Sequence, residues 1–168
     1  TPSTGSTFTV RLPLVQVPGP VAPQAPEQTG LPRSAPRTRI LVAEDHPVNQ
    51  KFMSLLLQRL GYAATLCGNG EAALQAMCAG EYDLVLMDIH MPVMDGLTAT
   101  RAIRAMPAPH GGVPIIALTA DVLQEARDRA RAAGVDAFIT KPVTQEELEA
   151  ALTAALARTQ APEPLAVQ

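Results

Sequence analysis

Five short apolar runs alternate with five longer stretches of helical periodicity from residue 38 onward, and this alternation restricts the fold more than any other feature of the sequence. The apolar runs are residues 39–43, 62–67, 82–88, 113–119 and 136–140, and the helical stretches are 47–61, 69–80, 96–106, 121–134 and 144–157. Strict strand–helix order predicts a parallel sheet covered on both faces, because right-handed crossovers place helices on each side. We therefore expect an α/β protein with a doubly wound parallel sheet.

Glycines and capping residues agree with these helix boundaries. Gly61, Gly80 and Gly134 are each the last residue of a helical stretch, where a residue in the left-handed conformation often ends a helix. Thr144 and Glu147 have the spacing of a capping box, which predicts the start of the last helix.

The chain ahead of this pattern has a different composition. Residues 15–37 are crowded with proline, which fixes φ and removes backbone donors, so we expect an extended linker. Residues 5–14 alternate polar and apolar side chains, as a strand exposed on one face would. Residues 159–168 form a polar tail. Because the sequence does not begin with Met, we expect it to be part of a longer chain.

Charge and hydropathy disfavour several classes of partner. The net charge of −3 and the absence of a Lys/Arg cluster predict no nucleic-acid partner and no contact with an anionic membrane. No apolar stretch approaches the roughly 18 residues of a membrane span, and the first residues do not resemble a signal peptide. We expect a cytoplasmic location, with any membrane anchor in another part of the parent chain.

Cysteine and histidine do not form a metal-binding pattern. Cys67 and Cys78 lack C-x-x-C spacing, and we expect both to be reduced and half-buried. His46, His90 and His110 are far apart in sequence and lack the spacing of zinc ligands.

Polar side chains follow four of the five expected strands. Glu44 and Asp45 follow the first strand, Asp88 and Thr119 end the third and fourth, and Lys141 follows the fifth. Open parallel sheets bind ligands outside the carboxyl ends of their strands. If the first and third strands are neighbours, the three carboxylates converge at one edge. Taken singly, each acid also suits a helix cap or a turn.

Three converging carboxylates require positive charge. Each pair at 4 Å repels by about 1 kcal/mol in bulk water and about 4 kcal/mol at an effective dielectric constant near 20. Lys141 supplies one positive charge, and the remainder calls for a divalent cation such as Mg²⁺. An aspartate beside Mg²⁺, an ammonium group and a hydroxyl is arranged for phosphoryl transfer, with Asp88 as the nucleophile and an aspartyl phosphate as the product.

Four motifs carry a family resemblance. ILVAEDHPVNQ, YDLVLMDIHMPVMDG, PIIALTA and DAFITKP occur in this order between residues 40 and 142. They resemble the receiver domain of two-component response regulators. The residues DHPVNQ and MDIHMPVMDG are especially similar to those of receivers carried by hybrid sensor histidine kinases. The resemblance covers residues 39–157 and implies a receiver domain at 38–158. It also implies a flavodoxin-like (βα)5 fold with strand order 2-1-3-4-5.

The resemblance implies a role for each polar residue of the strand ends. Asp88 would accept a phosphoryl group from the phosphohistidine of a kinase or of a histidine phosphotransfer domain. Thr119 would bond a phosphoryl oxygen, and Lys141 would pair with the phosphate. The ligands of Mg²⁺ would be Glu44, Asp45, Asp88 and the backbone carbonyl of His90.

Further residues follow from the same resemblance. Thr119 and Phe138 would be switch residues that move after phosphorylation, although Phe138 also suits simple core packing. The Lys141–Pro142 peptide bond would be cis. The His90 side chain is expected in solvent. The helix at 121–134 is rich in arginine, which suits either readout contacts or a solvated face.

The segment TGSTFTVRLPL, residues 4–14, resembles the last strand of a histidine-kinase ATP-binding domain, so that residues 1–14 would be a remnant of that domain. This resemblance places the fragment directly after a kinase core, so that kinase activity would belong to the parent chain. Without the rest of its sheet, we expect this strand remnant to be disordered or to pair with another molecule.

Two other functions remain open from the residues alone. One is a receiver-like scaffold that binds a kinase or another protein without being phosphorylated, although a scaffold has no need of the acids and Lys141. The other is a small flavodoxin-like enzyme or flavin binder, which the missing Gly-rich phosphate loop after the first strand disfavours. A second copy of this chain is a further candidate partner.

Overall fold

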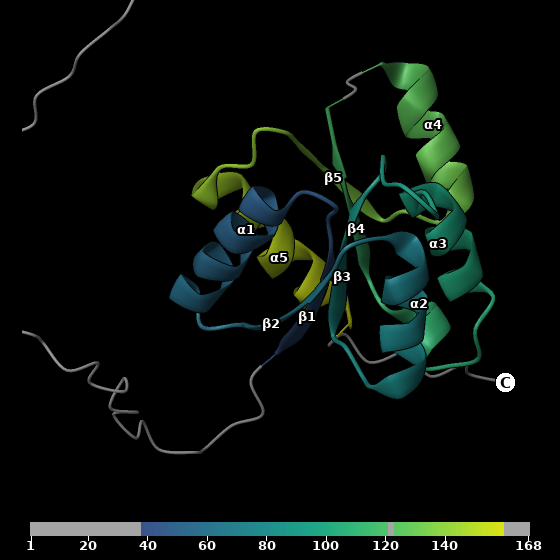
Figure 1. Cartoon of the computed structure of the whole chain (residues 1–168), viewed down its shortest axis with the longest axis horizontal. Coiled ribbons are helices and arrows are strands. Elements are labelled where there is room, and N and C mark those ends of the chain that lie inside the picture. The colour runs from purple at the N-terminus through teal and green to yellow at the C-terminus, as the bar shows by residue number, and fades with distance from the viewer. Residues whose placement is uncertain (1–37, 121–122, 160–168) are drawn as a thin grey trace, which may run out of the picture. The chain divides into compact units, whose positions relative to one another are not determined.

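The computed structural model describes residues 38–120 and 123–159 (Figure 1). The expectations about the strand remnant, the linker and the tail beyond residue 159 lie outside these residues. Within them, strands and helices alternate along the chain: β1 (Arg39–Ala43), α1 (Pro47–Arg59), β2 (Ala63–Cys67), α2 (Gly70–Ala79), β3 (Leu84–Asp88), α3 (Gly96–Arg104), η1 (His110–Gly112), β4 (Ile115–Thr119), α4 (Gln124–Ala133), β5 (Ala137–Thr140) and α5 (Gln145–Thr159).

The strands form one parallel sheet in the order β2-β1-β3-β4-β5. The predicted fold class and strand order are therefore confirmed. The short 3-10 helix η1 was not predicted, because two of the three residues of His110–Gly112 are glycines and give no helical pattern.

Helices cover both faces of the sheet, with α1 and α5 on one side and α2, α3 and α4 on the other (Figure 1). The central strands β3 and β4 are buried at every residue, as doubly covered strands must be. Alternate residues of each strand enter opposite cores: Ile40 and Val42 face α1 and α5, whereas Leu41 and Ala43 face α2 and α3. This packing fixes where each strand ends.

The structure confirms most of the predictions about the residues that begin and end the helices. Gly61 and Gly134 have φ of 86° and 102°, in the left-handed region. The prediction for Gly80 is wrong, because its φ of −158° is extended backbone that any residue adopts. The capping box is present, with the Thr144 hydroxyl accepting from the Glu147 N–H at 3.3 Å and donating to its carboxylate at 3.0 Å.

The two cysteines are free, but they are not both half-buried as expected. Cys67 ends β2 inside the core, with 9% of its surface exposed, and Cys78 lies on the outer face of α2 and is exposed. The difference arises because Met77, not Cys78, occupies the inward position of that helical turn. Among the helices of the described ranges, none has the length and apolar character needed to cross a bilayer.

Candidate functional site

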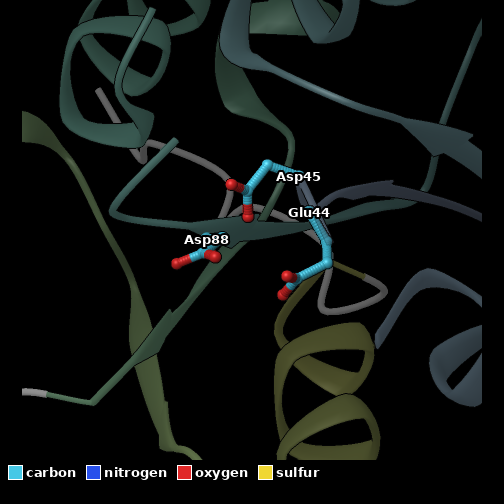
Figure 2. Close-up of side chains that lie close together, drawn as sticks. All are labelled: Glu44, Asp45 and Asp88. Atoms are coloured by element: carbon cyan, nitrogen blue, oxygen red, sulfur yellow. The ribbon is translucent and has the colours of Figure 1, made fainter. Parts of the chain in front are cut away.

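Three carboxylates lie together at the carboxyl edge of the sheet. Glu44 and Asp45 follow β1 and Asp88 ends β3, and the two strands pair in register up to Ala43 and Met87. An oxygen of each carboxylate lies within 4.8 Å of an oxygen of the others. Figure 2 shows the three side chains close together. Glu44 and Asp88 are 1% and 5% exposed, whereas Asp45 is open to solvent. The predicted convergence is present.

Lys141 bridges two of these acids from the end of β5. Its Nζ donates to Glu44 Oε2 at 2.7 Å and to Asp88 Oδ2 at 2.6 Å. The Lys141 backbone N–H donates to the Thr119 carbonyl at 2.8 Å, which fixes the start of the loop beside β4. The Lys141–Pro142 peptide bond is cis, as the resemblance implies. The ammonium group therefore lies in the position from which it neutralises both buried carboxylates.

Burial and charge shift the ionisation of these groups. Burial raises the pKa of Asp88 above its ordinary value; Lys141 and the His90 N–H oppose this effect, and the charge of Glu44 adds to it. Burial also acts to raise the pKa of Glu44, but hydrogen bonds from Lys141 and Asn49 outweigh it and hold that pKa below its ordinary value. For Lys141, burial is outweighed by Asp88 and Glu44, which raise its pKa. Lys141 is thus firmly protonated at neutral pH.

Backbone groups complete the surroundings of Asp88. The His90 N–H donates to Asp88 Oδ1 at 3.2 Å, and the His90 side chain is exposed, as expected. Gly96, which opens α3, has no room for a side chain, because a β-carbon there would overlap the Asp88 carbonyl. The motif MDG contains this glycine, but the sequence alone does not show which backbone it approaches. The predicted role of the His90 carbonyl as a metal ligand stays a prediction.

Thr119 and Phe138 belong to the neighbouring strands β4 and β5 and have different surroundings. Thr119, 1% exposed, ends β4 and lines a cavity of about 70 Å³ together with His90 and Arg129. Phe138 is half-buried, and the guanidinium carbons of Arg127 and Arg131 both lie 5.8 Å from its ring centre. The arrangement ties Phe138 to α4, and its role as a switch remains a prediction.

Two amides from α1 hold Glu44, and the sequence reasoning missed both. Asn49 Nδ2 donates to Glu44 Oε1 at 2.9 Å, and Gln50 Nε2 donates to the Glu44 carbonyl at 2.7 Å. The only sequence signal for them was their position in the motif EDHPVNQ, which carries no information on where their side chains point.

The donor set of this edge fits Mg²⁺. Hard cations of this size prefer carboxylate oxygens and retain several waters. Glu44, Asp45 and Asp88 supply oxygens within 4.8 Å of one another, and the exposed position of Asp45 leaves access for water.

A doubly wound sheet that collects an acid triad and a lysine at its carboxyl edge is the arrangement of receiver domains. The family model of the response regulator receiver domain matches residues 40–153, and the chain belongs to this family.

Hybrid kinases are among its similar proteins. Sensor protein GacS of Pseudomonas syringae pv. syringae is 37% identical over 131 residues, which are 76% of this chain and 14% of that protein. Sensor histidine kinase RcsC of Escherichia coli is 36% identical over 114 residues, which are 68% of this chain and 12% of that protein. The chain therefore spans only a small part of these relatives.

Solved structures agree with the fold. The receiver domain of sensor histidine kinase PA1611 from Pseudomonas aeruginosa PAO1 is 41% identical, with a TM-score of 0.67, and the match covers 72% of this chain and 98% of that one. That structure has a magnesium ion coordinated in its active-site cleft. Chemotaxis protein CheY4 of Vibrio cholerae is 28% identical, with a TM-score of 0.68 and a match over 71% of this chain and 99% of that one.

Proposed function

We propose that this chain is the phosphoacceptor receiver of a hybrid sensor histidine kinase, and that Asp88 takes a phosphoryl group from a phosphohistidine in a two-component phosphorelay. The observation that carries the proposal is the Lys141–Asp88 hydrogen bond of 2.6 Å inside a triad of carboxylates. A buried aspartate at a strand end, with a shared ammonium group beside it, is a nucleophile held in a fixed position.

Phosphoryl transfer to Asp88 requires a bond to form at the aspartate and another to break at the donor histidine. A carboxylate oxygen of Asp88 attacks phosphorus, the P–N bond to the donor imidazole breaks, and its electron pair returns to that nitrogen. Lys141 pairs with an oxygen of the transferred group, and the Thr119 hydroxyl donates to another. Mg²⁺, when bound by Glu44, Asp45, Asp88 and the His90 carbonyl, would supply further charge neutralisation. The site keeps the aspartate oriented while charge is redistributed.

An exposed apolar stripe on α1 supports a protein as the phosphodonor. Val48, Phe52 and Leu55 are 68%, 46% and 48% exposed and follow one side of the helix. Phe52 also lines a cavity of about 430 Å³ together with Glu44 and Lys141. Because the stripe is continuous with the site, a histidine-bearing domain seated on it would bring its imidazole to Asp88. We propose this stripe as the docking face of that domain.

The kinase relatives support a further proposal about the setting of the domain. We propose that residues 1–14 are the end of a kinase ATP-binding domain, that 15–37 are a linker, and that 38–158 are the receiver. This placement implies that the receiver works in the cytoplasm. In the phosphorylated state Thr119 and Phe138 would move, and the surface of α4, β5 and α5 would report the change.

Intact mass spectrometry after incubation with acetyl phosphate and Mg²⁺ tests the proposal. We expect one added phosphoryl group, which is lost in Asp88→Asn and retained in Asp83→Asn, a matched change to an exposed aspartate at the opposite end of β3. A chain that gains no phosphoryl group under these conditions, yet binds a kinase core, would instead be the scaffold.

A further inference from the structure

Glu44 is the most enclosed acid of the triad, and its two oxygens have different donors. Oε2 receives the Lys141 ammonium at 2.7 Å. Oε1 receives the Asn49 amide at 2.9 Å and the His46 backbone N–H at 3.2 Å. With 1% of its surface exposed, Glu44 depends on these protein donors, because little water reaches it.

Lys141 donates hydrogen bonds to two carboxylates, whereas the Asn49 amide donates to Glu44. The ammonium also donates to Asp88 at 2.6 Å, and the proposed reaction requires it to pair with the phosphoryl group formed there. As Lys141 turns toward that group, Glu44 loses its only charged donor among the contacts that the structure describes. The Asn49 amide is unaffected by this movement. It is also neutral, so it does not compete with a cation for the site.

Helix α1 fixes the amide in place. Asn49 belongs to the first turn, after His46 at the N-cap and Pro47 at the first helical position. The next residue, Gln50, donates to the carbonyl of Glu44 at 2.7 Å and to that of Cys67 at 3.4 Å. The start of α1 therefore holds Glu44 by both its main chain and its side chain, and ties it to the end of β2.

We propose that Asn49 is a positioning residue that keeps the Glu44 carboxylate in the acid triad, so that Lys141 is released to serve the phosphoryl group on Asp88. This inference rests on the proposed function. It assigns the first turn of α1 a part in cation binding and phosphoryl uptake, although Asn49 itself touches neither the cation nor the reacting atoms.

A double-mutant cycle with Asn49→Ala and Glu44→Ala tests this role. Mg²⁺ binding is measured by isothermal titration calorimetry, and the dissociation constant in Asn49→Ala is expected to rise about tenfold, the lower end of the effect of one lost hydrogen bond to a charged group. In the Glu44→Ala background, Asn49→Ala is expected to have no further effect. Gln58→Ala, an exposed amide at the other end of α1, is the matched control and should leave the constant unchanged.

Urea unfolding of the four metal-free proteins gives a second readout. Asn49→Ala is expected to raise the unfolding equilibrium constant. The factor by which it rises should be about tenfold larger in the protein that has Glu44 than in the Glu44→Ala background. The change in helix propensity is the same in both backgrounds and cancels in the cycle. Equal effects in both backgrounds, or none in either readout, would overturn the inference.

The two readouts separate this inference from the proposed function. A wild-type chain that takes up neither Mg²⁺ nor a phosphoryl group contradicts the proposed function. The unfolding cycle then still decides whether Asn49 holds Glu44: coupling there supports the positioning contact, and its absence refutes it.

Discussion

Gly96 lies so close to Asp88 that a β-carbon on the glycine would overlap the aspartate's carbonyl oxygen. The Gly96 N–H donates to the Ile89 carbonyl at 2.9 Å, which holds the start of α3 against the end of β3. The main chain at the start of α3 therefore packs against the main chain of the candidate phosphoacceptor Asp88 and holds it in place. Any side chain at position 96 must displace one of the two elements.

Gly96→Ala is expected to lower the free energy of unfolding by about 1–3 kcal/mol, because the added carbon meets rigid backbone. It should also slow phosphoryl uptake, since relief of the overlap moves Asp88 relative to Lys141. Urea unfolding and intact mass after acetyl phosphate measure the two effects. Gly112→Ala is the control, because a β-carbon at Gly112 has no neighbour within 4 Å. Equal results for both glycines would contradict the close approach.

Asp88→Asn is expected to raise stability at neutral pH in the absence of divalent cations. The pKa of Asp88 is raised in the folded state, so the fold binds this proton more tightly than the unfolded chain does. Stability therefore falls as pH rises from below the unfolded pKa through the folded pKa, and the neutral variant escapes that loss. The advantage of Asp88→Asn should disappear as the pH is lowered to the range where the wild-type carboxyl is protonated.

Urea unfolding from pH 3 to pH 8 in the presence of EDTA measures this difference. Adding Mg²⁺ at neutral pH should stabilise the wild type and reduce the gap, since a ligand that binds only the folded state stabilises it. A variant advantage that is constant across the pH range would show that ionisation of Asp88 is not its cause.

The sheet and the acid triad were predictable because they depend on periodicity and on strand ends. The runs ending at Ala43 and Asp88 fix where Glu44, Asp45 and Asp88 must lie once the strand order is known. Contacts between side chains far apart in sequence carry no such signal. Arg104, for example, donates to the carbonyls of Gly111, Val113 and Gly134 and to the Asp136 carboxylate, and no pattern in the sequence marks it.

Gly80 shows that a glycine at the end of a helix does not by itself predict the backbone conformation there. Glycine after a helix predicts a left-handed residue, but here the chain leaves α2 in an extended conformation. A β-carbon at Gly80 would lie 3.3 Å from the Arg39 guanidinium and 3.8 Å from the Tyr82 ring. The nearby groups restrict the side-chain space at this position, which is a tertiary effect that helix-end rules do not contain.

Val93→Gly is expected to raise the free energy of unfolding by about 1 kcal/mol, because strain at a positive φ exceeds the entropy cost of glycine. Val93 has a φ of 69°, which is rare for a β-branched residue, and the Met94 N–H closes the turn onto Pro92 at 2.8 Å. Val93 is 79% exposed, so little burial is lost. Urea unfolding of Val48→Gly, at an exposed helical valine, should show the opposite sign.

Thiol labelling should separate the two cysteines. Burial raises the pKa of the Cys67 thiol, so less thiolate is present at neutral pH, and the core also blocks access to it. Cys78 is exposed and should react with iodoacetamide at least about tenfold faster. Peptide mapping over time measures the two rates. Similar rates in native buffer would show that β2 opens on the labelling timescale.

Phe52→Ser is expected to slow phosphoryl uptake from a protein donor by about tenfold or more, as the loss of a central aromatic contact does, while uptake from acetyl phosphate stays within about twofold. Under the proposed docking, the small donor needs only Asp88 and its charged neighbours, whereas a histidine-bearing domain must also contact α1. The histidine-phosphorylated kinase core of the relative GacS serves as the protein donor, and transfer is followed by intact mass. Leu123→Ser is the matched control, since Leu123 is 66% exposed at the N-cap of α4, a helix that covers the opposite face of the sheet from α1. If both donors slow equally, Phe52 acts on the site itself through the cavity that it shares with Glu44 and Lys141, and if neither slows, the phosphodonor docks elsewhere.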